Sequence, residues 1–246
     1  MLLPFGHRII HLPSVDSTNN YAANLLREEK IGHGAVILAD EQSAGRGQRG
    51  TSWTSKAGEN LLVTFLALPD NLSVSNQEVI TQFITVSIAD FLGNIGISAS
   101  IKWPNDIYVA DKKLAGILIE NALSSGNIVS SIIGVGLNVN QINFESLNAT
   151  SIAAELGEKR PIMDVLFQLI DAMNKNWSAL NNSQLKQRYL SNMYLLNVPA
   201  FFEDENGRFA GIIRGTDERG RLEIETNGKL KYYSLKEVSF LSQNDL

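Results

Sequence analysis

Short apolar runs separated by polar turns fill the first half of the chain, a pattern that predicts a strand-rich domain. Strands are expected at Arg8 to Leu12, Ala35 to Ala39, Leu61 to Leu68, Ser100 to Trp103, Ile107 to Val109, Leu114 to Glu120 and Val129 to Asn138. The longer segment from Gln77 to Leu92 is apolar on most sides, which predicts a helix buried within a layered domain. Together these segments predict an α/β (α+β) domain with a central sheet and flanking helices.

Helical spacing of apolar residues marks three further segments. A cluster of helix-capping side chains, Asp16 to Asn19, precedes apolar residues at Tyr21, Ala22, Leu25 and Leu26. Pro161 stands at the first turn of a second helix, whose apolar stripe comprises Ile162, Val165, Leu166, Leu169, Ile170, Met173 and Trp177. A third helix is expected from Ser183 to Met193. The first of these helices therefore starts with a group of polar side chains.

The pattern changes after Pro199, where short period-two segments alternate with turns. The turn signals are Glu203 to Gly207, Asp217 to Gly220, and Asn227-Gly228. They predict a small antiparallel β-barrel. We therefore expect two domains, residues 1–196 and residues 197–246.

Charge and composition narrow the function. The 246 residues include 21 Lys and Arg against 26 Asp and Glu, and the net charge of −5 argues against nucleic acid as the main partner. No apolar run approaches the roughly 20 residues that span a bilayer, and the N-terminal segment does not resemble a signal peptide. We expect a cytoplasmic protein without a membrane partner.

The chain has no cysteine and three scattered histidines, which excludes disulfides, thiolate metal sites and cysteine nucleophiles. Chemistry must therefore come from lysine, arginine, hydroxyl, amide and carboxylate side chains.

A loop rich in glycine and arginine, Gly45 to Thr51, follows the second expected strand. Its glycine spacing fits neither a P-loop nor a dinucleotide-binding turn, and a plain surface turn is an equally good reading of the loop alone. Physically, Arg46 and Arg49 offer two guanidinium groups to an anion, and Trp53 offers a flat face to a planar ring. A nucleotide or an acyl phosphate would suit this loop.

Three strand-associated segments also carry polar or glycine residues. Lys102 to Asp106 ends a strand with a proline, and alone it would be interpreted as a tight turn. Gly116 lies inside the Lys113 to Glu120 strand, and Gly134 to Asn140 contains two more glycines. Strand glycines cost stability unless something approaches the backbone closely. A ligand pressed against the sheet would account for them.

These segments, in this order, resemble the motifs of biotin protein ligases. The matching segments are Ser17-Thr18-Asn19, Gly45 to Gly50 with Trp53, Lys102 to Asp106, Lys113 to Glu120, and Gly136 to Asn140. The resemblance spans about residues 15 to 140. It implies a mixed central sheet of the class II aminoacyl-tRNA synthetase-like biotinyl/lipoyl ligase type, and the C-terminal segment is similar to the family's SH3-like β-barrel in length and pattern.

The resemblance is to the short, non-regulatory form, because Ser17 comes too early for the winged helix that precedes this motif in DNA-binding members. We therefore expect no binding to operator-like DNA. Gln48 and Thr51 depart from the family, in which arginine is frequent at both positions. Their contribution to holding an adenylate is left open.

The resemblance implies that the protein joins biotin to ATP, forming biotinyl-5′-AMP, and then modifies a lysine of a biotin carboxyl carrier protein or carrier domain. In this interpretation Lys113 and Arg46 are catalytic, because fixed cations favour the approach of a carboxylate to a phosphate. Mg²⁺ would be held by the phosphates and Asp106.

The implied biotin-binding residues match the donors and acceptors of the ureido ring and the path of the acyl chain; they are Ser17, Thr18, Asn19, Gln42, Arg46, Gly47, Gln48, Lys113 and Gly116. We expect Ser17 to cap its helix as well. The implied nucleotide-binding residues are Arg49, Trp53, Lys102, Asn105 and Asn138. For Asn138, a role as a strand-end turn residue is equally compatible with the sequence.

Two alternatives remain at this stage. A lipoate or octanoate ligase or transferase would share the fold, and a non-catalytic biotin-binding adaptor would keep the sheet and barrel. The Arg46 loop and the Lys102 to Asp106 segment favour biotin, and Lys113, Arg46 and Asp106 together favour an enzyme. The oligomeric state, monomer or homodimer, is left open.

Overall fold

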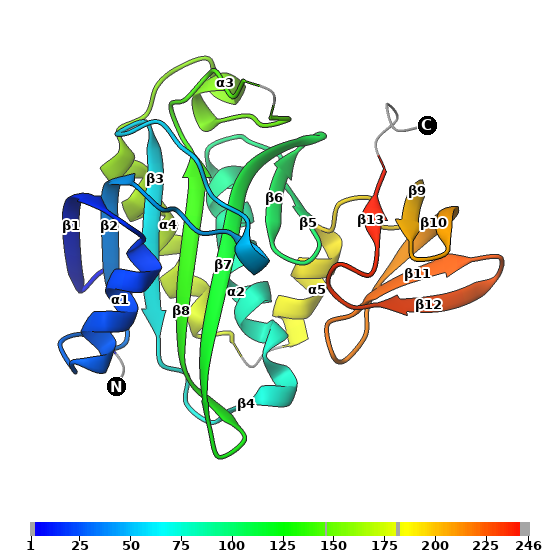
Figure 1. Ribbon diagram of the computed structural model, residues 1–246, viewed down its shortest axis with the longest axis horizontal. Helices are drawn as coiled ribbons and strands as arrows, with labels where there is room; N and C mark the ends of the chain where they lie inside the picture. Colours follow the sequence, from blue (N-terminus) through cyan, green and yellow to red (C-terminus); the bar gives the residue numbers. More distant parts are fainter. Residues whose placement is uncertain (1–2, 146, 181–182, 242–246) are drawn as a thin grey trace.

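The structure is a computed structural model and describes residues 3–145, 147–180 and 183–241 (Figure 1). Within these residues the strands form an eight-stranded sheet and a separate five-stranded sheet. The order in the large sheet is β1-β2-β3-β8-β7-β6-β5, with short β4 (Leu72–Ser73) beside β8. β1 and β2 are parallel and the other neighbours are antiparallel, so the predicted mixed central sheet is confirmed.

The strands of the large sheet coincide with the seven predicted apolar runs. They are β1 (Arg8–Val15), β2 (Ala35–Gln42), β3 (Asn60–Ala67), β5 (Ser100–Lys102), β6 (Asp106–Val109), β7 (Lys112–Ser124) and β8 (Asn127–Asn138). Four of them, β1, β2, β7 and β8, extend clearly beyond the apolar runs. Hydrogen bonding to a neighbouring strand continues through polar residues that the hydropathy pattern does not mark.

Helices cover both faces of this sheet. α2 (Glu78–Asn94) and α4 (Ile162–Trp177) pack on one face, and α1 (Thr18–Arg27) packs on the other. β2 shows the consequence, because Val36 and Leu38 join the large core while Ile37 joins a smaller core with Ala22 of α1. Every residue of β3 is buried, as expected for a strand covered on both sides.

The remaining helices are short. α5 (Ser183–Ser191) ends two residues before the predicted boundary, and α3 (Ile152–Leu156) lies where no helix was predicted. Two single turns of 3-10 helix, η1 (Gln48–Gly50) and η2 (Val74–Asn76), complete the helical elements of the described residues. None of the described helices combines the length and the apolar character that crossing a bilayer requires.

The C-terminal strands form the second sheet, in the order β12-β11-β10-β9-β13. Their bounds are β9 (Pro199–Asp204), β10 (Gly207–Thr216), β11 (Leu222–Thr226), β12 (Lys229–Tyr233) and β13 (Ser239–Phe240). The predicted Asn227-Gly228 turn joins β11 to β12, with both residues at positive φ as a two-residue hairpin requires. The change of sheet after α5 supports a boundary near residue 196, which stays a prediction, as does the likeness to an SH3-like barrel.

The burial of His33 predicts that the stability of the fold depends on pH. Its side chain is buried, and its Nδ1 accepts a hydrogen bond from the Leu68 backbone N–H at 3.0 Å. Burial lowers the pKa of His33, whereas in the unfolded chain histidine titrates near 6.5. Protons therefore bind preferentially to the unfolded chain below about pH 6.5, and the free energy of unfolding falls as the pH decreases from there.

We expect urea denaturation at pH 8, 6 and 5 to show this loss. His33→Gln provides a side chain that does not titrate, so its free energy of unfolding should change less over the same interval. An equal pH dependence in both proteins would assign the effect to other groups.

Candidate active site

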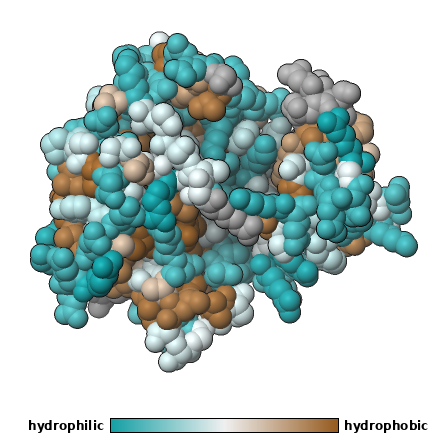
Figure 2. Space-filling model, in the orientation of Figure 1, coloured by the Kyte–Doolittle hydropathy of each residue, from teal (hydrophilic) through white to brown (hydrophobic). Residues whose placement is uncertain are grey.

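A cavity of about 330 Å³ opens on the α1 face of the large sheet, beneath the loop that carries η1. Figure 2 shows this side of the molecule, with a hollow between the main sheet and the C-terminal lobe. The cavity brings together twelve of the predicted site residues, namely Ser17, Thr18, Asn19, Gln42, Arg46, Gly47, Gln48, Trp53, Asn105, Asp106, Lys113 and Gly116. Residues that are far apart in the sequence thus line the same cavity.

The start of α1 forms one polar wall. Thr18 donates its backbone N–H to Gln42 Oε1 at 2.8 Å, and the Asn19 side chain donates to Glu120 Oε2 at 2.8 Å. Ser17 occupies the N-cap position but makes no side-chain capping hydrogen bond, so the expectation that it caps the helix was wrong. Gln42 takes the backbone N–H of Thr18 instead, which leaves the buried Ser17 hydroxyl at the cavity.

The glycine-rich loop closes back on itself above the cavity. Gly47 donates its N–H to the Thr51 carbonyl at 2.7 Å, and Trp53 donates its N–H to the Gly45 carbonyl at 2.9 Å. These two hydrogen bonds fold the loop into a small hairpin that lies above the sheet. Arg49 belongs to η1, but its side chain lies outside what the structure describes.

Arg46 lines the cavity from this loop. Its guanidinium donates to Glu120 Oε1 at 2.5 Å and to Asn20 Oδ1 at 2.6 Å. Both side chains of the Arg46–Glu120 pair are more than a third exposed, so the pair contributes at most about 1 kcal/mol to stability. An anionic ligand can therefore displace Glu120 at small cost.

Lys113 and Asp106 form the second charged pair of the cavity. The Lys113 Nζ lies 2.8 Å from Asp106 Oδ2, because β6 and β7 pair side by side and Asp106 lies opposite Gly116. Lys113 Nζ also lies 5.8 Å from the centre of the Trp53 ring. The cavity thus holds a fixed ammonium group beside a carboxylate.

Asp106 does not form a metal site by itself. One of its oxygens already accepts from Lys113, and the described residues contain no cluster of three or more His, Cys, Asp or Glu side chains able to hold a metal. The expectation that the phosphates and Asp106 together hold Mg²⁺ stays a prediction.

The strand glycines make room for protein side chains. Gly116 and Gly136 lie opposite each other on β7 and β8, and the Trp53 indole rests on both. A Cβ on Gly116 would approach Trp53 Cζ3 to 2.9 Å, and one on Gly136 would overlap the ring. Gly134 accommodates Asn19 in the same way. In this structure Trp53 and Asn19 pack on these glycines, which also line the cavity, so the expectation of a ligand directly against them stays a prediction.

Trp53 also carries an unused donor. Its indole Nε1 is buried and has no hydrogen-bond partner among the residues that the structure describes. A buried N–H without an acceptor is costly, so this donor marks a position where a ligand acceptor would be favourable.

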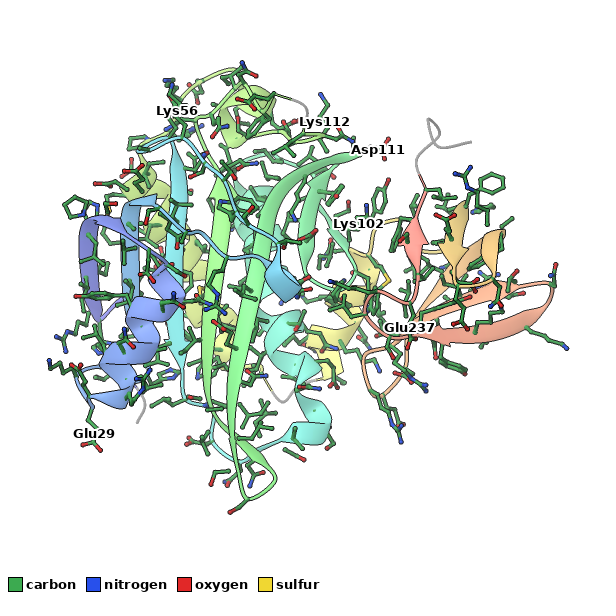
Figure 3. All side chains as sticks on the ribbon, viewed as in Figure 1. Glu29, Lys56, Lys102, Asp111, Lys112 and Glu237 are labelled. Carbon is green, nitrogen blue, oxygen red and sulfur yellow. The ribbon has the colours of Figure 1, made fainter. Side chains whose placement is uncertain are left out.

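Lys102 and Asn138 lie outside the cavity walls. The Lys102 ammonium lies 4.6 Å from the Tyr108 ring centre and 5.2 Å from that of Phe240, and burial lowers the pKa of Lys102. Figure 3 shows Lys102 between the main sheet and β13. Asn138 is buried and donates to the Thr150 carbonyl at 2.9 Å, a structural role at the end of its strand. The structure therefore brings neither residue into the cavity.

Sequence reasoning missed Glu120, Asn20 and Thr64. Thr64 lies on β3; its hydroxyl donates to Asn19 Oδ1 at 2.6 Å and lies 2.8 Å from the Thr18 hydroxyl, and these contacts fix the start of α1. Glu120 lies two and four residues beyond Leu118 and Gly116, so strand alternation places it on the cavity face. That periodicity was a usable signal for Glu120, whereas the contact of Asn20 with Arg46 depends on how the loop folds.

Comparisons with known proteins agree with this geometry. The family model of the biotin/lipoate A/B protein ligase family matches residues 11–138. The bifunctional ligase/repressor BirA of Escherichia coli is 30% identical over 96% of this chain and 75% of its own length, and the biotin--[acetyl-CoA-carboxylase] ligase of Mycobacterium tuberculosis is 28% identical over 94% and 89%.

Solved structures resemble the chain over nearly its whole length. A biotin protein ligase from Aquifex aeolicus, in complex with biotin and ATP, is 29% identical and superposes with a TM-score of 0.78 over 95% of this chain and 98% of that one. The fold, the matched motifs and the extent of these similarities lead to one assignment: the chain belongs to the biotin/lipoate A/B protein ligase family, and within it to the biotin protein ligases.

Proposed function

We propose that this protein is an ATP-dependent ligase that converts biotin and ATP into biotinyl-5′-AMP and pyrophosphate, and then transfers the biotinyl group to a lysine of a biotin carboxyl carrier protein. The observation that carries the proposal is the cavity itself. It joins a wall of hydroxyl and amide side chains at the start of α1 to the cations Lys113 and Arg46. The related Aquifex ligase has been solved with biotin and ATP bound.

The polar wall suits the ureido ring of biotin. A buried urea needs a partner for each N–H and for its carbonyl, and each unmet group costs about 1–3 kcal/mol. Ser17, Thr18 and Asn19 are all buried and lie together at this wall. Because Gln42 and Thr64 hold Thr18 in place, the wall is ordered before a ligand arrives.

The cationic end suits the reacting anions. In the first step a biotin carboxylate oxygen attacks the α-phosphorus of ATP, and the bond to pyrophosphate breaks with its electron pair. Two anions must meet, so a fixed ammonium group such as that of Lys113 lowers the barrier. Asp106 holds the Lys113 amine by its 2.8 Å ion pair. Magnesium would enter with ATP as part of the substrate, since Mg²⁺ is often bound chiefly by substrate phosphates and water.

In the second step the carrier lysine attacks the acyl carbon of the adenylate as a neutral amine. The new C–N bond forms as the acyl C–O bond breaks, AMP leaves with the electron pair, and the nitrogen releases its extra proton. Lys113 would favour the neutral form of the incoming amine, because like charges repel. The adenylate is sensitive to water, so the glycine-rich loop above the cavity would shield it.

The test separates this function from its alternatives. The protein is incubated with radiolabelled ATP and either biotin or lipoate, and the products are examined for an acyl-adenylate and for its transfer to a purified carrier domain. Biotinyl-adenylate followed by carrier labelling supports the proposal. Lipoyl-adenylate would indicate a lipoate ligase, and biotin binding without an adenylate would indicate an adaptor.

Arg46→Ala is expected to weaken retention of the intermediate. The variant removes a charge-assisted partner of the anion, so free biotinyl-AMP and labelling of bystander lysines should rise about tenfold. Release is measured by chromatography of reaction mixtures without carrier. Arg27→Ala, an exposed arginine on α1, is the matched control and should leave release unchanged. Equal release from all three proteins would show that the loop holds the adenylate by other groups.

A further inference from the structure

A second cavity of about 350 Å³ adjoins the first. The two share Gln48, Pro104, Asn105 and Leu235 in their walls. The other walls of the second cavity come from the first turns of α2, from β7 and from the β10–β11 loop of the C-terminal lobe. It therefore lies where the large sheet and the C-terminal lobe meet, and the residues that the two cavities share form the wall between them.

Hydrogen bonds to three different parts of the fold fix the segment Trp103 to Asn105, which forms part of the wall between the cavities. Trp103 Nε1 donates to the Gly220 carbonyl at 3.0 Å, and the Tyr189 hydroxyl donates to the Pro104 carbonyl at 2.9 Å. The Asn105 side chain donates to the Ile117 carbonyl of β7. Three consecutive residues are thus tied to the C-terminal lobe, to α5 and to the large sheet. Asp106, the partner of Lys113, follows directly in the chain.

Glu78 lines this second cavity and carries a carboxylate oxygen that is buried without a hydrogen-bond partner among the described residues. This oxygen is Oε2, and burial raises the pKa of Glu78. A carboxylate in the first turn of α2 is favourable for the helix, which explains its presence there. The position of Glu78 in the helix does not explain why one of its oxygens is buried without a hydrogen-bond donor. An N–H group of an incoming ligand would supply that donor.

Among the charges near Glu78, Lys186 acts on its carboxylate electrostatically, but no hydrogen bond or ion pair joins the two among the described residues. Arg221, which also lines the cavity, is paired with Asp217 at 2.7 Å. Arg219 lines the cavity from an exposed loop position and is the cation of its outer rim. Trp103, Ile119 and Leu235 add apolar surface of the kind along which the methylenes of a lysine side chain pack.

We propose that this second cavity is the entry port for the acceptor lysine of the carrier protein, and that Glu78 is a positioning residue that receives its ammonium group before transfer. The inference rests on the proposed function. On the loop side, an amine would have to pass the Arg46–Glu120 ion pair and the closed hairpin of the glycine-rich loop. The second cavity meets the active site at Pro104 and Asn105, beside Asp106 and Lys113.

The test measures the two half-reactions separately, with a carrier domain that the wild-type protein biotinylates. Glu78→Gln should leave biotin-dependent ATP–pyrophosphate exchange unchanged. It should raise KM for the carrier domain about tenfold, because one charge-assisted hydrogen bond is lost, and it should change kcat little. Transfer to hydroxylamine, a small neutral amine, should be unchanged. Glu218→Gln removes the same charge from an exposed position outside the cavity walls and should behave as wild type.

A second variant tests the entry port by steric blocking and leaves Glu78 unchanged. Thr81→Tyr adds a ring to the α2 wall of the cavity and should block transfer to the carrier while pyrophosphate exchange persists. Unchanged carrier kinetics in both variants would overturn the inference, as would an equal loss in both half-reactions or a changed KM for ATP. Absence of exchange in the wild-type protein would instead refute the proposed function.

Discussion

Lys113→Ala is expected to lower the rate of biotinyl-adenylate formation by about 100-fold or more, as removal of one preorganised group at a developing charge does in other enzymes. Lys113 provides the ammonium group at the point where the carboxylate and the α-phosphate meet in the proposed reaction, and its Nζ lies 2.8 Å from Asp106. The rate is measured as biotin-dependent release of pyrophosphate.

The fold should tolerate this substitution. Lys113 and Asp106 are each about one third exposed, so loss of the pair costs at most about 1 kcal/mol of stability. Lys112→Ala is the matched control, because Lys112 is the exposed neighbour at the β6–β7 turn (Figure 3) and does not line the cavity. If the Lys113 variant releases pyrophosphate at the wild-type rate, Lys113 is not a catalytic residue.

Gly136→Ala is expected to weaken binding of biotin and ATP strongly and to destabilise the protein by about 1–3 kcal/mol. The new methyl group would overlap the Trp53 indole, which rests on the Gly116 and Gly136 backbone. Trp53 would have to move, and with it the end of the glycine-rich loop that Trp53 anchors by its hydrogen bond to Gly45. Calorimetric titration with biotin and thermal denaturation measure the two effects.

Gly93→Ala is the control for this change. Gly93 lies in α2 with open space where a Cβ would be placed, so alanine there should raise stability by about 0.5–1 kcal/mol and leave binding unchanged. If Gly136→Ala binds biotin as well as the control does, the packing of Trp53 on the sheet does not shape the site.

Local pattern was sufficient to predict most elements of the large sheet. The segment Leu61 to Leu68 shows why, since a run apolar at nearly every position has to be covered on both faces, and β3 is buried throughout. The Asn227-Gly228 turn is similar, because its residues suit positive φ at both positions of a tight hairpin. The parallel pairing of β1 with β2 carried no such local signal.

The candidate site was predictable in its members but not in its contacts. Motif order identified twelve of the residues that line the cavity, since side chains at strand ends and helix starts on one face of a sheet converge. The same reasoning included Lys102 and Asn138, whose side chains turn to aromatic rings and to the Thr150 carbonyl. The chemistry of a side chain determines which partners it can bind, but only the packing of the fold determines which of these partners lies within contact distance.

The sequence by itself determined the strand-rich domain, the change of pattern after Pro199 and the set of polar groups available for chemistry, because these follow from periodicity, turn residues and composition. The tertiary structure decided that Glu120 meets Arg46, that Trp53 packs on Gly116 and Gly136, and that Glu78 lines a second cavity. The first two of these contacts join residues more than 40 positions apart. Their geometry depends on sheet register and loop closure, which no local pattern encodes.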